Sequence, residues 1–344
     1  EIAKAVASES NIIIMDEPTA SISESEIKRL FKIIRELKRN NVTVIYISHR
    51  LDEIFEIGDY VTVMRDGKHI ATKPVAEMED RSELIRMMIG KSIVESYIPK
   101  EAEEEDILLE VRNLSNEKLK NIAFNIKKGE VVGFYGLVGA GKTELARAIF
   151  GADRYSGEVI FKGKQLGSTP AKAIEAGIAL VPEERRTQGI FTILTIRSNI
   201  PVMNMKKISN GGFVDAAKEK QVAIEYIDKL KIVTSGPEKE TAKLSGGNQQ
   251  KLVFAKCLFA DSDLLILDEP TRGIDVGAKS EIYSIVRQLA EGGKSIMFLS
   301  SELPEILNLC DRIFLLFDGE IKAELINGPD IDSRKIIHIV TGGE

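Results

Sequence analysis

Apolar and polar positions alternate along the chain with two different periods. Apolar residues of 24–39 follow helical spacing, which predicts a helix there, and a buried strand is predicted over 42–48. The helical spacing recurs over 282–289 and is followed, after two glycines, by a predicted strand over 296–299. Strands separated by helices of this length indicate a parallel sheet with helices on both faces. The predicted fold class is therefore α/β.

The pattern also repeats. Residues 12–19 read IIIMDEPT and residues 264–271 read LLILDEPT, an offset of 268 − 16 = 252 that continues without a gap to Gly67 and Gly319 (319 − 67 = 252). The second copy continues upstream for more than a hundred residues, and we expect the front of the first copy to be missing. We predict a truncated first unit over 1–100, an acidic linker over 101–106 and a complete second unit over 107–344.

Composition narrows the class of protein. A chain of 344 residues exceeds one ordinary domain, and 43% hydrophobic with 29% charged residues is typical of a globular protein. The longest apolar runs are far shorter than the roughly 20 residues that cross a bilayer, so membrane work would need a partner. Forty-seven basic and fifty-three acidic residues give a net charge of -6, which disfavours nucleic acid as a ligand. Two cysteines and no signal peptide point to a reducing cytoplasm.

One glycine-rich stretch has the pattern of a phosphate-binding loop. It follows a predicted strand over 131–135 and precedes a predicted helix over 144–150, and its residues are Gly136, Leu137, Val138, Gly139, Ala140, Gly141, Lys142 and Thr143. Glycines allow backbone N–H groups to surround phosphate oxygens at a helix start, where the partial positive charge attracts anions. Lys142 would neutralise the β and γ phosphates of a nucleotide, and the Thr143 hydroxyl would bind Mg²⁺.

Two carboxylates follow an apolar strand in each copy of the repeat. Asp268 and Glu269 come directly after 264–267, at the end of a strand where doubly wound sheets bind ligands. Asp268 is suited to hold Mg²⁺ through water, and Glu269 can orient the attacking water or accept its proton. The alternative is an Asp-Glu-Pro turn that only ends the strand.

A third motif links these residues to a known family. Residues 244–251 read LSGGNQQK before a predicted helix, which on its own is compatible with an N-capping serine and two glycines. Together with the loop and the acidic pair, the motif resembles the signature sequence of ATP-binding-cassette (ABC) ATPases, and the resemblance covers essentially the whole chain. It implies a P-loop NTPase of RecA-like type, with an antiparallel β subdomain and a helical lobe at about 190–244.

The resemblance also implies how the site is assembled and which residues belong to it. Two cassettes face each other head to tail, and ATP with Mg²⁺ lies between one phosphate loop and the signature of the other cassette. The implied nucleotide-binding set adds Glu144, Ser245, Gly246, Gly247 and Asp275 to the phosphate loop. Glu183 occupies the place of a metal-sensing glutamine. The implied catalytic set is Glu269 and Ser301 in the second copy, with Glu17 and His49 in the first.

Further features narrow the resemblance to one branch of the family. Fused cassettes, the sequence NQQK after the signature and a serine at 301 in place of histidine resemble the energising subunits of bacterial simple-sugar importers. We expect a peripheral ATPase on the cytoplasmic face of the membrane, partnered by permease subunits and, through them, by a sugar-binding protein. A nucleoside importer and a soluble twin-cassette protein acting on ribosomes or DNA are the alternatives. Since Ser301 replaces a histidine, we expect weak ATP turnover by this chain.

Overall fold

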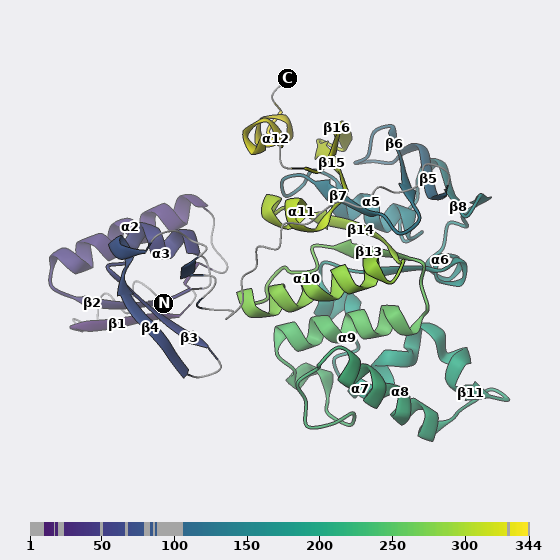
Figure 1. The fold of residues 1–344 in the computed structure, drawn as a ribbon, viewed down its shortest axis with the longest axis horizontal. Helices are drawn as coiled ribbons and strands as arrows, with labels where there is room; N and C mark the ends of the chain where they lie inside the picture. Colours follow the sequence, from purple (N-terminus) through teal and green to yellow (C-terminus); the bar gives the residue numbers. More distant parts are fainter. Residues whose placement is uncertain are drawn as a thin grey trace. The chain divides into compact units, whose positions relative to one another are not determined.

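The computed structural model describes residues 10–16, 18–19, 24–48, 51–65, 68–78, 83–84, 87, 106–328 and 331–342. The chain divides into two compact units, residues 1–95 with 275–277 and residues 96–274 with 278–344, and each is considered by itself (Figure 1). The predicted linker residues 101–105 lie outside the described residues, and Asp106 is exposed. None of the helices in the described ranges is long and apolar enough to cross a bilayer.

A six-stranded sheet forms the centre of the second unit. Its strands are, in spatial order, β10 (Ile178–Val181), β13 (Leu264–Asp268), β14 (Ser295–Ser300), β7 (Val131–Tyr135), β15 (Arg312–Phe317) and β16 (Glu320–Ile326). The first five are parallel, whereas β16 pairs antiparallel with β15. Successive side chains of β7, β13 and β14 are buried on both faces of the sheet, as expected for a parallel sheet covered by helices. The predicted α/β fold with a parallel-sheet core is confirmed.

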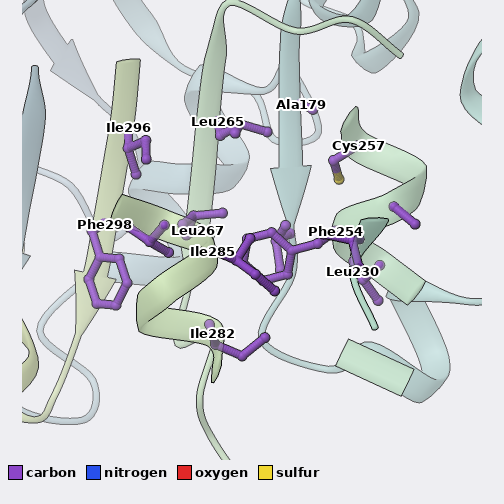
Figure 2. Packing of buried hydrophobic residues seen from close by; sticks show 14 of the residues in the cluster. Ala179, Leu230, Phe254, Cys257, Leu265, Leu267, Ile282, Ile285, Ile296 and Phe298 are labelled. Carbon is purple, nitrogen blue, oxygen red and sulfur yellow. The ribbon is translucent and has the colours of Figure 1, made fainter. Parts of the chain in front are cut away.

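Two apolar cores lie on opposite faces of this sheet. On one face, Leu265 and Leu267 of β13 pack against Phe254 of helix α9 (Gly246–Phe259) and Ile285 of helix α10 (Val276–Glu291) (Figure 2). On the other face, Leu264, Ile266, Met297 and Leu299 pack with helix α5 (Lys142–Ile149). The helices α6 (Pro170–Ala176), α11 (Leu303–Leu309) and α12 (Ser333–Val340) complete this part of the unit.

A separate antiparallel sheet contributes to the second core. Its strands lie in the order β6 (Ile122–Lys127), β5 (Ile107–Ser115), β8 (Ser156–Phe161) and β9 (Lys164–Gln165). Phe124 of β6 packs edge-on against Phe134 of β7, with ring centroids 4.8 Å apart, and so joins the two sheets. This sheet corresponds to the antiparallel subdomain that the family resemblance implies.

The segment 190–244 is largely helical. It contains α7 (Ile196–Asn199), a 3₁₀ helix (Ile200–Ile208), a hairpin of β11 (Ser209–Asn210) and β12 (Phe213–Val214), and α8 (Ala216–Lys229). Its apolar side chains Ile196, Ile200 and Ala223 belong to the same cluster as α9 and the sheet. The helical segment is therefore packed onto the central unit through α9.

The first unit reproduces the rear of the second, element by element. Its elements are β1 (Ile12–Asp16), α2 (Glu24–Arg39), β2 (Thr43–Ile47), α3 (Leu51–Ile57), β3 (Tyr60–Arg65) and β4 (Lys68–Pro74), followed by a 3₁₀ turn, Val75–Glu77. Adding 252 to the bounds of β1, α2, α3, β3 and β4 gives the bounds of β13, α10, α11, β15 and β16. The repeat seen in the sequence is thus a repeat of structure.

The two copies differ in burial, and one prediction is wrong for that reason. The strand expected to be buried at 42–48 is β2, in which Ile45 and Ile47 are each 48% exposed. Their counterparts Met297 and Leu299 are fully buried because α5 and the antiparallel sheet cover that face. The described residues of the first unit include no counterpart of these covering elements.

Both cysteines are buried free thiols, and from their burial we predict slow reaction with alkylating reagents. Burial raises the pKa of Cys257 to about 11 and raises the pKa of Cys310 well above its ordinary value. Since the thiolate is the reactive form, the neutral thiols should resist iodoacetamide at pH 8, by roughly 100-fold in rate against the denatured chain. Mass spectrometry of the native and urea-treated chain measures this. Rapid labelling of the native protein, or a disulfide in it, would contradict the expectation.

Candidate nucleotide site

The phosphate-loop sequence forms a tight connection between β7 and α5. Two glycines are required by its geometry: a Cβ on Gly136 would lie 2.7 Å from the Leu316 carbonyl oxygen, and Gly141 has a φ of 103°. Gly141 is the N-cap of α5, so the helix begins at Lys142, two residues earlier than predicted. The free N–H groups of this helix start and its partial positive charge make the loop suited to bind an anion.

Lys142 lies inside the site rather than at its surface. Its side chain is 6% exposed, and its Nζ donates to the carbonyl oxygens of Gly136 at 2.6 Å and Leu137 at 3.1 Å. The same Nζ is 3.4 Å from Oε1 of Glu269. Burial lowers the pKa of Lys142, while the Glu269 carboxylate opposes that shift. Bound phosphate would supply further negative charge, which favours the protonated ammonium group.

Asp268 ends β13 beside the helix that carries Thr143. Burial raises the pKa of Asp268 to about 6, and the neighbouring Thr143 hydroxyl opposes the shift. The side chain is 2% exposed, and its Oδ1 is buried without a hydrogen-bond partner. A buried carboxylate oxygen with no donor, next to a hydroxyl, fits the oxygen ligands that Mg²⁺ prefers. The residues present therefore fit a magnesium ion held through Thr143 and Asp268.

Glu269 has a strained backbone. Its φ is 45°, a region that residues other than glycine rarely adopt, and its N–H donates to the Leu299 carbonyl oxygen at 2.9 Å. Burial raises the pKa of Glu269, whereas Lys142 and hydrogen bonds from the Ser301 N–H and hydroxyl lower it. The ion pair with Lys142 holds this carboxylate inside the site. Glu269 is thus placed to orient a water molecule and accept its proton.

Ser301 lies beside Glu269, directly after β14. Its proximity lowers the pKa of the Glu269 carboxyl group. A neutral hydroxyl at this position does not supply the charge of a histidine. Glu17 and His49, the corresponding predicted residues of the first copy, lie outside the described residues.

The glutamate in the predicted glutamine position lies beside the same site. Oε2 of Glu183 accepts a hydrogen bond from Thr143 Oγ1 at 3.2 Å, and Oε1 forms an ion pair with Arg272. Glu144, in the first turn of α5, instead pairs with Lys118, where Oε1 lies 2.5 Å from Nζ. Lys142 thus pairs with Glu269 and Thr143 with Glu183, and Asp268 lies close enough to Lys142 and Glu269 for their charges to shift its pKa.

The signature residues form the start of α9. Ser245 is its exposed N-cap, yet the serine side chain makes no capping bond, and its Oγ accepts from Asn248 Nδ2 at 2.8 Å. A Cβ on Gly246 would lie 2.9 Å from Arg185 Nη2, and one on Gly247 would lie 2.7 Å from the Ala278 Cβ. The glycines therefore permit close packing around the start of α9. The predicted Asp275 is exposed just before α10.

Sequence reasoning missed a buried glutamate that holds the acidic loop in place. Glu305 is 2% exposed and accepts hydrogen bonds from Thr271, from Ser300 Oγ at 2.7 Å and from Tyr283 OH at 2.8 Å. It joins the turn after Glu269 to the end of β14. Its counterpart Glu53 (305 − 53 = 252) is also buried and accepts from Ser48 Oγ at 2.8 Å. The repeat offset was the signal that could have found both.

Fold and site together define the nucleotide-binding cassette of an ABC ATPase, and comparison with known proteins agrees. The ABC transporter family model matches residues 119–272. A solved nucleotide-free ATP-binding cassette from an ABC transporter superposes with a TM-score of 0.58 at 21% identity, covering 69% of this chain and 100% of that chain. A dimeric cassette bound to ADP and Pi superposes with a TM-score of 0.56 at 22% identity, covering 64% and 99%.

Curated relatives extend the similarity to both units. The chain is 46% identical to a ribose import ATP-binding protein of Rubrobacter xylanophilus, over 99% of this chain and 69% of that protein. It is 42% identical to a ribose import ATP-binding protein of Bacillus subtilis, over 100% of this chain and 70% of that protein. The chain belongs to the family of ATP-binding proteins of ABC importers.

Proposed function

We propose that this chain binds and hydrolyses ATP to energise a membrane importer of a monosaccharide, with ribose the first candidate. The observation that carries the proposal is the meeting of Lys142, Thr143, Asp268 and Glu269 where β7 and β13 end, with Lys142 Nζ 3.4 Å from Glu269. Two predicted halves of one phosphate site, about 130 residues apart in sequence, supply these side chains. The sugar follows from the names of the relatives, which are ribose import ATP-binding proteins.

Binding begins at the loop. The N–H groups at the start of α5 and the Lys142 ammonium group would bind the β and γ phosphates, replacing the loop carbonyls that Lys142 now contacts. Thr143 and Asp268, with Glu183 beside them, would hold Mg²⁺, which supplies charge neutralisation at the phosphate oxygens. Lys142, Asp268 and Glu269 are buried, so their electrostatic interactions with the nucleotide would be stronger than those of exposed groups.

Hydrolysis would depend on Glu269. Its burial raises the carboxylate's proton affinity, and its ion pair with Lys142 would hold it in place, so it could orient water toward the γ phosphate. Completion of the site would require the signature of a facing cassette, because the helix start at Gly246 offers N–H groups for the remaining phosphate oxygens. We therefore include in the proposal both the roles of these site residues and the pairing of two cassettes.

The segment between Glu183 and α7 is the proposed contact for the membrane subunits. Phe191 is 52% exposed and Ile193 87% exposed, and both lie in one short segment that also contains the half-exposed Leu194. Exposed apolar side chains gathered in one segment are typical of a surface that binds another protein. Such a partner would hold the chain at the cytoplasmic face of the membrane.

Site-directed photocrosslinking tests the import function. A photoreactive residue at Ile193, in cells co-expressing the chain with the permease encoded beside its gene, should give a crosslink to that permease. A photoreactive residue at Lys164, on the antiparallel sheet, is the matched control and should give none. Crosslinks from Ile193 to ribosomal proteins, with none to the permease, would instead favour a soluble twin-cassette protein.

A further inference from the structure

Backbone hydrogen bonds fix Arg272 on both sides, and its side chain extends from the loop. Its N–H donates to the Glu269 carbonyl oxygen at 3.0 Å, and its own carbonyl oxygen accepts from Arg185 Nη1 at 2.8 Å. The side chain is 56% exposed. The loop after the acidic pair therefore holds a cationic side chain next to the candidate nucleotide site.

The guanidinium group of Arg272 contacts a carboxylate that belongs to the site. Its Nη1 pairs with Oε1 of Glu183, and the other oxygen of the same carboxylate accepts from Thr143 Oγ1 at 3.2 Å. Glu183 thus lies between an arginine and the hydroxyl that would bind Mg²⁺. One side chain separates Arg272 from the metal and phosphate positions.

The carboxylates around the loop outnumber the cations that pair with them, which indicates a role for the positive charge of Arg272. Three carboxylates, those of Glu183, Asp268 and Glu269, lie at the site, and Lys142 is already paired with Glu269 at 3.4 Å. Without Arg272, Glu183 would present an uncompensated negative charge next to a triphosphate. Like charges at this range repel, and a partly dry environment screens them poorly.

We propose that Arg272 is a positioning residue that neutralises Glu183, so that the Glu183–Arg272 pair acts as one neutral unit beside the bound Mg-ATP. The inference rests on the proposed binding of ATP at this loop. In this arrangement Arg272 acts through Glu183 and does not itself bind the phosphates. Removal of the glutamate charge should therefore make the arginine dispensable, which separates this role from direct phosphate binding.

A double-mutant cycle on the whole chain tests the proposal, with Mg-ATP titrated by calorimetry. Arg272→Gln should weaken binding about tenfold, and the loss should shrink as salt is raised, because it arises from an unpaired charge. In a Glu183→Gln background, Arg272→Gln should cause no further loss of affinity, because the carboxylate that the arginine neutralises is already absent. Arg272→Lys, which keeps the charge, should bind like the wild type.

Controls separate the possible failures. Arg186→Gln removes a nearby exposed arginine that pairs with Gln249, and it should have no effect on affinity. If Arg272→Gln binds like the wild type while Lys142→Ala does not bind, the inference fails and the proposed ATP site stands. If Arg272→Gln weakens binding by the same factor with Gln at position 183 as with the native glutamate, the arginine acts on the nucleotide or the fold directly, and the inference fails. Absence of ATP binding by the wild type would end both proposals.

Discussion

Replacement of Lys142 by alanine should weaken Mg-ATP binding to the 344-residue chain by roughly 100-fold or more, as measured by calorimetry. The ammonium group is 6% exposed and faces the loop carbonyls, so its charge acts in a poorly screened environment. The loop N–H groups remain in the variant, but they supply partial charges alone. The expected loss therefore exceeds that for any exposed cation of the chain.

Lys164→Ala is the matched control for this variant. Lys164 lies in β9, is exposed and belongs to the antiparallel sheet, so its removal should leave the affinity for Mg-ATP unchanged. Thermal melting of both variants would show that the fold is intact. Wild-type affinity in Lys142→Ala would mean that this loop does not bind the nucleotide phosphates.

Asp268→Ala should remove the effect of magnesium on ATP binding. The wild type is expected to bind ATP about tenfold more tightly with Mg²⁺ than with a chelator, because Thr143 and Asp268 would hold the metal. The variant should bind equally weakly in both conditions, at the affinity of the wild type with chelator. Titration of ATP in paired Mg²⁺ and chelator buffers measures the difference.

The other end of the same strand provides the control. Asp263 precedes β13, is 47% exposed and pairs with Lys162, so Asp263→Ala should retain the full magnesium effect. A magnesium effect of wild-type size in Asp268→Ala would contradict the assignment of the metal ligands. Loss of the effect in both variants would indicate a general loss of structure.

Local pattern was sufficient to predict the elements that position the site. The strand at 131–135 and the helix at 24–39 have the predicted bounds, because uninterrupted apolar runs and helical spacing are local signals. The start of α5 was placed two residues late because the left-handed Gly141 acts as its N-cap, which periodicity does not report. The prediction that Ile45 and Ile47 are buried was wrong because burial depends on which elements cover a strand.

The candidate site shows the same division between local and distant information. The residue types and spacing of the loop, the acidic pair and the signature predicted which residues carry chemistry. Spacing did not indicate that Ser301 lies beside the Glu269 carboxylate or that Arg272 pairs with Glu183, since these residues are 32 and 89 positions apart (301 − 269 = 32; 272 − 183 = 89). Such pairings require the sheet order, which places β13 and β14 side by side and brings the ends of distant strands together.

Hydrogen–deuterium exchange of the whole chain with and without Mg-ATP tests the central claim most directly. That claim is that one nucleotide binds where the ends of β7 and β13 meet the start of α5. The account predicts slower exchange in peptides covering 136–149 and 264–273, and loss of that protection in Lys142→Ala. Protection elsewhere in the chain with unchanged exchange over 136–149 would contradict it.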